Sequence, residues 1–119
     1  MIKKSALVLI LLTFVPGMLL AADVTGKWDF TSKSSYGETY ELILVLQEQD
    51  GKLTGTLGNW DGSIPLEKVT LEGDKLTFDV YISGVTYTAE LAVSGKEMTG
   101  SYEGTNGNSG TITAKHSGE

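Results

Sequence analysis

The stretch GDKLTFD, residues 73–79, decides the fold because its pattern occurs three times in the chain. DGKLTGT at 50–56 and SGKEMTGS at 94–101 repeat its order of a glycine turn, a lysine, an apolar residue and a threonine. A constant spacing of 22 residues separates the turn glycines Gly51, Gly73 and Gly95. That length holds two strands and two turns, and glycine supplies the positive φ that tight turns require. The repeat predicts one hairpin step taken three times around a sheet.

Apolar and polar residues alternate with a period of two through residues 23–119, which predicts strands throughout. This region lacks the apolar spacing of an amphipathic helix. The clearest strand is KLTFDVYIS at 75–83, in which every second side chain from Leu76 is apolar. Further strands are predicted at 24–31, 38–48, 52–58, 63–71, 86–93, 98–103 and 111–115. Pro65 cannot donate a backbone hydrogen bond, so we expect a strand end or a bulge there.

The connections between the eight predicted strands are too short for crossover helices, so neighbouring strands must be antiparallel. An open meander leaves two unpaired edges, and closure into a barrel removes them. We therefore expect an all-β fold, an eight-stranded antiparallel up-and-down meander closed into a small barrel. A two-sheet sandwich is the alternative, although it usually needs longer crossing connections.

Residues 1–22, MIKKSALVLILLTFVPGMLLAA, have the three parts of a secretory signal peptide. Two lysines precede an apolar run at 6–15, and two alanines precede the expected cleavage after Ala22. The run is shorter than the roughly 20 apolar residues of a spanning helix. We expect a signal-peptide helix that is removed, one domain at 23–119, and a secreted or periplasmic protein without stable membrane insertion. An uncleaved anchor is the alternative.

The chain has a formal net charge of −6 and contains neither arginine nor cysteine. Negative charge without arginine argues against nucleic acid as a partner, because phosphate binding relies on basic side chains. Without disulfides, the fold must rest on a hydrophobic core. The single histidine, His116, lies near the C-terminus, and no carboxylates are spaced around it as metal ligands would be. We expect no metal, no cofactor and no enzymatic activity.

Gly26, Trp28 and Lys115 carry a resemblance to a known superfamily. Gly-x-Trp, here GKW at 26–28, in the first strand of such a meander resembles the signature of the calycins, the lipocalin and avidin superfamily. In that superfamily the tryptophan packs across one end of the barrel, and a basic side chain from the last strand lies over it. The resemblance implies that Trp28 plugs one end and that Lys115 covers it. The chain also resembles small secreted bacterial β-domains with GKW…GDKLTGT repeats, whose function is generally unassigned.

The strand directions predict where a binding site lies. Trp28, Lys115 and the three repeat turns share one end of the barrel, and the longer connections at 32–38, 58–63 and 103–110 share the other. Ligand sites in small barrels lie at such an open mouth. We therefore expect a small apolar or glycan-like ligand at the end opposite Trp28.

Several residues near this end are candidates for ligand contact. Trp60 in GNWDG offers an indole that stacks on sugar or aromatic rings, and Asp61 beside it accepts hydrogen bonds. The alternative is that Trp60 caps the mouth while Asp61 shapes the turn. Further polar groups are expected from Tyr36, Tyr40, Tyr87, Tyr102, Asn106 and Asn108. Tyrosines also suit ordinary core or rim positions, and asparagines also suit turn geometry.

These observations support two hypotheses from different classes. In the first, the protein is a secreted non-enzymatic binding module with a small-molecule or glycan ligand at the barrel mouth. In the second, it is a protein-interaction or structural domain whose barrel core is filled. The space left inside the barrel separates the two.

Overall fold

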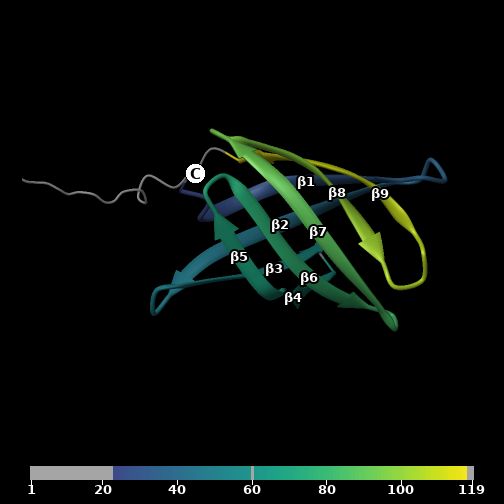
Figure 1. Ribbon diagram of the computed structural model, residues 1–119, viewed down its shortest axis with the longest axis horizontal. Helices are drawn as coiled ribbons and strands as arrows, with labels where there is room; N and C mark the ends of the chain where they lie inside the picture. Colours follow the sequence, from purple (N-terminus) through teal and green to yellow (C-terminus); the bar gives the residue numbers. More distant parts are fainter. Residues whose placement is uncertain (1–22, 60, 118–119) are drawn as a thin grey trace, which may run out of the picture.

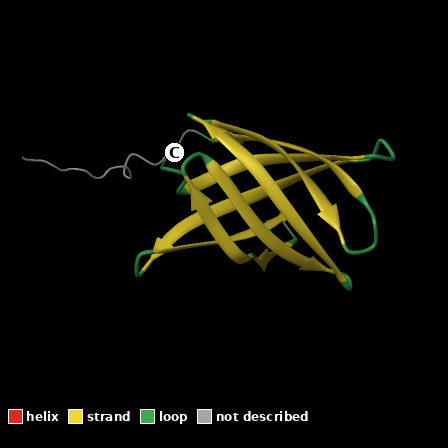
Figure 2. Cartoon of the chain, in the orientation of Figure 1, coloured by secondary structure: helices red, strands yellow, loops and turns green. Residues whose placement is uncertain are grey.

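The computed structural model describes residues 23–59 and 61–117, so the predicted signal peptide at 1–22 lies outside the described residues. All regular elements of the described part are strands, as Figure 2 shows. Within that part, no helix is long and apolar enough to cross a membrane. The strands are β1 Gly26–Ser34, β2 Thr39–Gln49, β3 Lys52–Asn59, β4 Gly62–Pro65, β5 Glu67–Glu72, β6 Lys75–Ile82, β7 Val85–Ser94, β8 Glu97–Gly104 and β9 Ser109–His116.

The strands form one antiparallel sheet that curls into a nearly closed barrel (Figure 1). Their order is β4-β3-β2-β1-β9-β8-β7-β6-β5, so the first and last long strands of the chain are neighbours. β1 pairs with β9 from Trp28 opposite His116 to Ser34 opposite Gly110. The predicted all-β antiparallel barrel is confirmed, but the described residues contain nine strands rather than eight.

The ninth strand results from a break in the predicted fourth strand. β4 ends at Pro65 and pairs with β3, while β5 pairs with β6. Pro65 has no N–H to continue a ladder, and Lys68 adopts a positive φ of 54° where the β5–β6 register shifts. Leu66 lies at the break, and its N–H donates to a carbonyl of β3 at 2.9 Å. The strand end predicted at Pro65 is confirmed.

Short glycine turns close one end of the barrel. The turns at 50–51, 73–74 and 95–96 join β2 to β3, β5 to β6 and β7 to β8, and their glycines have positive φ angles. We call this end, which also holds Trp28, the plugged end. The opposite end, which we call the mouth, carries the turns at 35–38, 83–84 and 105–108 and the connection from β3 to β4. In Figure 1 the plugged end is on the left and the mouth is on the right.

The interior of the barrel is packed with apolar side chains. Alternation along each strand places one row inside and the next row outside. Trp28 is fully buried, and Leu44, opposite it on β2, is buried as well. The other buried apolar side chains among the described residues are Val24, Phe30, Leu46, Leu57, Leu66, Leu76, Phe78, Val80, Ala89, Leu91, Val93, Met98, Ile112 and Ala114. The body of the barrel is therefore a filled core.

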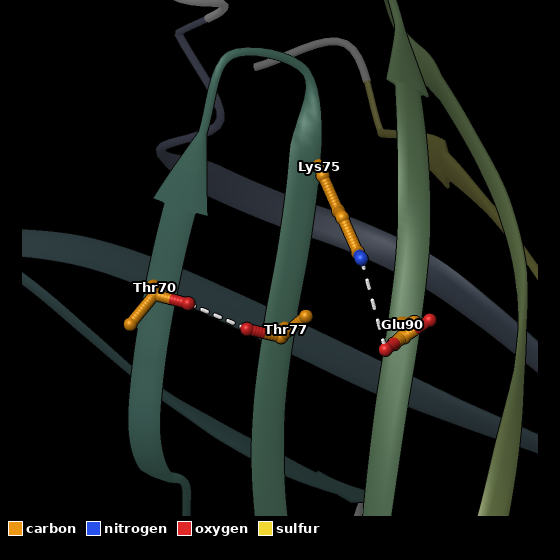
Figure 3. A network of polar contacts seen from close by, with 4 residues as sticks. All are labelled: Thr70, Lys75, Thr77 and Glu90. Atoms are coloured by element: carbon orange, nitrogen blue, oxygen red, sulfur yellow. Dashed lines mark hydrogen bonds and ion pairs between the residues drawn. The ribbon is translucent and has the colours of Figure 1, made fainter.

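The outer face of β5, β6 and β7 is polar. Figure 3 shows the hydroxyl groups of Thr70 and Thr77 hydrogen-bonded between β5 and β6. In the same view, the Lys75 amine lies 3.8 Å from a Glu90 carboxylate oxygen across β6 and β7. Such cross-strand pairs help to hold neighbouring strands in register. Because Lys75 and Glu90 are both exposed, their ion pair adds little to stability.

The basic side chain that covers Trp28 belongs to His116, so the expectation for Lys115 is wrong. His116 lies opposite Trp28 in register, and their ring centroids are 5.0 Å apart with ring planes at 78°. Lys115 lies opposite Asp29 and is exposed. Neighbouring residues of a strand point to opposite faces, so a shift of one position moves a side chain from inside to outside.

Gly26 makes room for this histidine. Its φ is 116°, and a Cβ at this position would lie 2.6 Å from His116 Nε2. The same nitrogen lies 3.2 Å from the carbonyl oxygen of Thr25. The indole N–H of Trp28 donates to the carbonyl of Val24 at 2.9 Å, which fixes the other ring of the pair. The Gly-x-Trp stretch therefore provides the space in which the side chain of His116, the last residue of β9, packs.

We predict that Trp28→Ala destabilises the fold strongly. Removing a fully buried indole costs about 3–5 kcal/mol in the free energy of unfolding, and urea denaturation measures that loss. Tyr81→Ala is the control, because Tyr81 is 57% exposed on β6 and its loss leaves no cavity in the core. Similar losses for the two variants would contradict the role given to Trp28.

We also predict that His116→Ala destabilises the fold more than Lys115→Ala. An aromatic pair of this geometry contributes about 1 kcal/mol, whereas truncation of an exposed side chain usually changes stability by less than about 0.5 kcal/mol. Thermal unfolding of the two variants gives the comparison. A larger loss of thermal stability for Lys115→Ala would instead support the contact between Lys115 and Trp28 that the calycin resemblance implies.

Candidate functional site

Three tyrosines continue the inward rows of the barrel at its mouth. Tyr40 on β2 lies opposite Ser32. Ser32 is the one polar residue that is buried in the described part of the chain. Tyr87 on β7 and Tyr102 on β8 are partly buried and pack against the apolar core. The lining therefore changes from purely apolar in the body of the barrel to hydroxyl-bearing at the mouth.

The rings of Tyr87 and Tyr102 form a fixed pair. Their centroids are 5.8 Å apart and their planes meet at 73°, an edge-to-face arrangement. Two glycines supply the space that the rings occupy. A Cβ at Gly104 would lie 2.9 Å from the ring of Tyr87, and a Cβ at Gly110 would lie 2.6 Å from the ring of Tyr102. Larger residues at these positions would displace the rings.

Glu38 adds a carboxylate to this group of tyrosines. The hydroxyl of Tyr40 donates to Glu38 Oε1 at 2.7 Å. Two hydrogen bonds to Ser34 fix the backbone of Glu38 at the end of the turn at 35–38. The Glu38 N–H donates to Ser34 Oγ at 3.1 Å, and the Glu38 carbonyl accepts from the Ser34 N–H at 2.8 Å. Gly37 allows the turn with a φ of 90°. We call Glu38, Tyr40, Tyr87 and Tyr102 the mouth cluster.

The surroundings of the mouth cluster favour neutral phenols. The hydrogen bond to Glu38 raises the pKa of Tyr40, and the negative charge of that carboxylate acts in the same direction. Burial raises the pKa of Tyr102, with smaller contributions from Tyr87 and Glu38. Because these shifts are upward, they stabilise the fold below the usual tyrosine pKa of about 10. That contribution is lost as the pH rises through the raised values.

The other candidates predicted from the sequence lie in separate turns of the mouth. Tyr36 is 78% exposed in the turn at 35–38. Asn106 Oδ1 accepts a hydrogen bond from the Asn108 N–H at 3.0 Å, which gives it a part in shaping the turn between β8 and β9. Of the predicted set, the structure brings Tyr87 and Tyr102 together, and ligand contact by any of them stays a prediction.

The connection between β3 and β4 is shorter than the loop predicted at 58–63. β3 continues through Asn59 and β4 begins at Gly62. The backbone N–H of Asp61 donates to Asn59 Oδ1 at 2.8 Å, and Asp61 is exposed. Trp60 lies outside the described residues, so its two predicted roles both stay open.

Sequence reasoning missed Glu38. A signal for it was present, because Glu38 and Tyr40 are two positions apart at the start of β2, where side chains of equal parity share a face. A carboxylate on the same face as a tyrosine hydroxyl at a strand end is a simple hydrogen-bonding pair. Among the described residues, no three histidine, aspartate or glutamate side chains are grouped so that they could hold a metal ion.

Two concave surfaces lie outside the barrel core. One, of about 680 Å³, lies on the outer face beside the mouth; polar side chains of β1, β7, β8 and β9 such as Lys33, Glu90 and Ser101 line most of it, and Tyr102 and Gly110 border it. The other, of about 970 Å³, lies at the plugged end, where β3 and β5 separate below the break at Leu66. Its lining mixes charged residues with partly buried Leu53, Val69 and Leu71, among others.

No protein-family model matches the chain, and no curated protein matches it. Solved structures of designed β-barrels do match. The redesigned barrel mFAP1, bound to DFHBI, has a TM-score of 0.62 at 16% identity, covering 78% of this chain and 94% of that one. The redesigned barrel mFAP0, also bound to DFHBI, has a TM-score of 0.60 at 18% identity, covering 78% and 98%.

A de novo designed fluorescence-activating β-barrel is also similar, with a TM-score of 0.56 at 17% identity over 77% of this chain and 92% of that one. At such low identity these likenesses show the fold and nothing finer. The chain therefore has a small β-barrel fold.

We predict that Glu38→Gln lowers the pKa of Tyr40. The amide keeps a hydrogen-bond acceptor but removes the negative charge, so the ionised phenolate is no longer repelled. Titration of the tyrosine ring ¹³Cζ signals by NMR follows each hydroxyl separately. Glu41→Gln is the matched control, because Glu41 follows Tyr40 in β2 and faces outward, opposite Thr31. An equal shift of Tyr40 in both variants would contradict the assigned cause.

Proposed function

We propose that the protein is an exported, non-enzymatic binding module that takes a small apolar or glycan-like molecule at the barrel mouth. The observation that carries this proposal is the position of Tyr40, Tyr87 and Tyr102, which face inward at the open end above a packed apolar core. A tyrosine ring offers a flat apolar face together with a hydroxyl group. This combination suits the faces and hydroxyl groups of sugars as well as aromatic rings.

The depth of the proposed site follows from the packing below it. Ile112 is buried one inward position below Gly110, the register partner of Tyr102, and Phe78 and Leu91 are buried further down. A ligand would therefore rest on the mouth cluster instead of entering the body of the barrel. Such a shallow site favours flat or small molecules over long chains.

Three further observations support parts of the proposal. The three-part segment at 1–22 supports export. Designed barrels of similar fold hold DFHBI, so this architecture is compatible with a small-molecule site. The histidine of the chain packs on Trp28 at the plugged end, away from the mouth, which supports a non-enzymatic role.

The packed core is the result that the second hypothesis predicts, a protein-interaction or structural domain with a filled barrel, and it restricts the first hypothesis to a ligand at the mouth. In that case the outer face would carry the function. The polar concavity lined by Lys33, Glu90 and Ser101 is the surface that this alternative would use. A ligand test that separates the inside of the mouth from its outer face decides between the two.

We predict that neutral aromatic dyes and 4-nitrophenyl glycosides, screened by thermal shift and NMR, include binders that perturb the amides of Tyr40, Tyr87 and Tyr102. Tyr102→Ala should weaken the binding of such a probe about tenfold, or about 1.4 kcal/mol, because the stacking surface is lost. Tyr81→Ala is the matched control, since Tyr81 lies at the same end of the barrel but is exposed on the outer face.

Two results would contradict the proposal. Perturbations confined to the outer face around Glu90 and Ser101 would favour the interaction domain. An equal loss of affinity in Tyr81→Ala and Tyr102→Ala would show that binding does not depend on the inward tyrosines. Circular dichroism of each variant confirms that the barrel is intact before affinities are compared.

A further inference from the structure

All five tyrosines of the chain lie at the mouth end of the barrel. They occur in the turn before β2, near the starts of β2 and β7, and near the ends of β6 and β8, as Tyr36, Tyr40, Tyr81, Tyr87 and Tyr102. Tyr36, Tyr40 and Tyr81 are exposed, and Tyr87 and Tyr102 are partly buried. The plugged end instead holds Trp28 with His116. Aromatic rings with accessible faces are thus concentrated at one end.

Charged side chains lie at both ends of the barrel, but they are balanced differently. In the described residues, five lysines lie at strand ends or turns of the plugged end, namely Lys27, Lys52, Lys75, Lys96 and Lys115, and carboxylates in or next to the same turns, namely Glu48, Asp50, Glu72, Asp74 and Glu97, offset them. The mouth carries carboxylates in or next to its turns, at Glu38, Glu41, Asp61 and Glu103. Lys33, near the end of β1, is exposed and lies opposite Thr111 on the outer face. The field at the mouth therefore favours the approach of cations.

The mouth cluster has the components that bind organic cations. The face of an aromatic ring is negative, so it attracts an ammonium group within about 6 Å of the ring centre. The ring planes of Tyr87 and Tyr102 make an angle of 73°, so the faces of the two rings are nearly perpendicular to each other. Glu38 supplies a full negative charge; it accepts the 2.7 Å hydrogen bond from Tyr40, and it is near enough to Tyr102 to contribute to the raised pKa of that phenol. Perpendicular rings with a nearby carboxylate are the arrangement of an aromatic cage.

We infer that the barrel mouth binds an alkylammonium group carried by a small molecule, with the ring faces of Tyr87 and Tyr102 against the cation and Glu38 as its counter-charge. This inference rests on the proposed function and names the chemical class of its ligand. The apolar body of such a molecule would rest on the partly buried side chains around the cluster. A neutral ligand of the same shape would lose the contributions of the ring faces and of the carboxylate.

The test compares choline with 3,3-dimethylbutan-1-ol, which has the same shape but carries no charge. Both are titrated into the protein, and binding is followed by NMR at the tyrosine amides. We expect choline to bind about tenfold more tightly, the size of a partly desolvated cation–π contact. Glu38→Gln should reduce the preference for choline over the alcohol several-fold, while Glu41→Gln should keep that preference.

Tyr102→Leu is the second variant, because it keeps apolar bulk and removes the ring face. The preference for choline should fall towards one in this variant, whereas Tyr81→Leu should keep it. Equal affinity of the two probes for the unaltered protein would overturn the inference and leave the proposed function standing. Binding of neither probe would overturn the inference as well, while the screen of neutral dyes and glycosides judges the proposed function independently. A preference for choline that survives both Glu38→Gln and Tyr102→Leu would also overturn it.

Discussion

The pairing of β1 with β9 is the constraint on which the rest of the structure depends. It joins the two strands that lie furthest apart in sequence and pairs the edges of both, so the sheet ends instead at β4 and β5, on either side of the break at Leu66. Trp28 and His116 lie opposite each other at one end of this pairing, and their rings fill the plugged end. Beyond the last pair, the N–H and the hydroxyl of Ser117 both donate to the carbonyl of Lys27 at 2.9 Å. The closure is thus fixed by backbone and side-chain contacts together.

The packing at the plugged end determines which part of the barrel interior stays accessible. The apolar side chains packed above Trp28 leave the mouth as the accessible part of the interior. There the glycines of β8 and β9 let the backbone pass close to the rings of Tyr87 and Tyr102. The same packing that stabilises the barrel therefore supports and orients the aromatic rings of the mouth cluster. The apolar core and the hydroxyl-bearing lining are therefore separated along the barrel axis.

Much of this arrangement could be predicted from the sequence. The period of two predicts the strands, and the glycines at 51, 73 and 95 predict the tight turns. These features are local, since they depend on alternation and on turn geometry. The resemblance to calycins predicts that Trp28 plugs one end and that a basic side chain covers it, but it selects Lys115 instead of His116. The register of the last strand decided between them, and it is set by pairing with β1, which no local pattern shows.

The break at Leu66 and the mouth cluster were harder to predict. Pro65 marked the end of a strand, but pairing of the two halves with different neighbours depends on how β3 and β5 separate in the closed barrel. The sequence makes Tyr87 and Tyr102 candidates because their hydroxyl groups are expected near the mouth. Their contact depends on the β7–β8 register and on the space above Gly104 and Gly110. Glu38 joins them only through the folded turn after β1.

The most direct test of the account measures which aromatic side chains a flavin dye can reach, by photochemically induced nuclear polarisation in the NMR spectrum of the free protein. The central claim is that one end of the barrel is plugged and the other is open. The account predicts no polarisation of Trp28, strong signals from Tyr40 and Tyr81, and weaker signals from the partly buried Tyr87 and Tyr102. A polarised Trp28 together with a silent Tyr40 would contradict it, because the plugged end and the mouth would then be reversed.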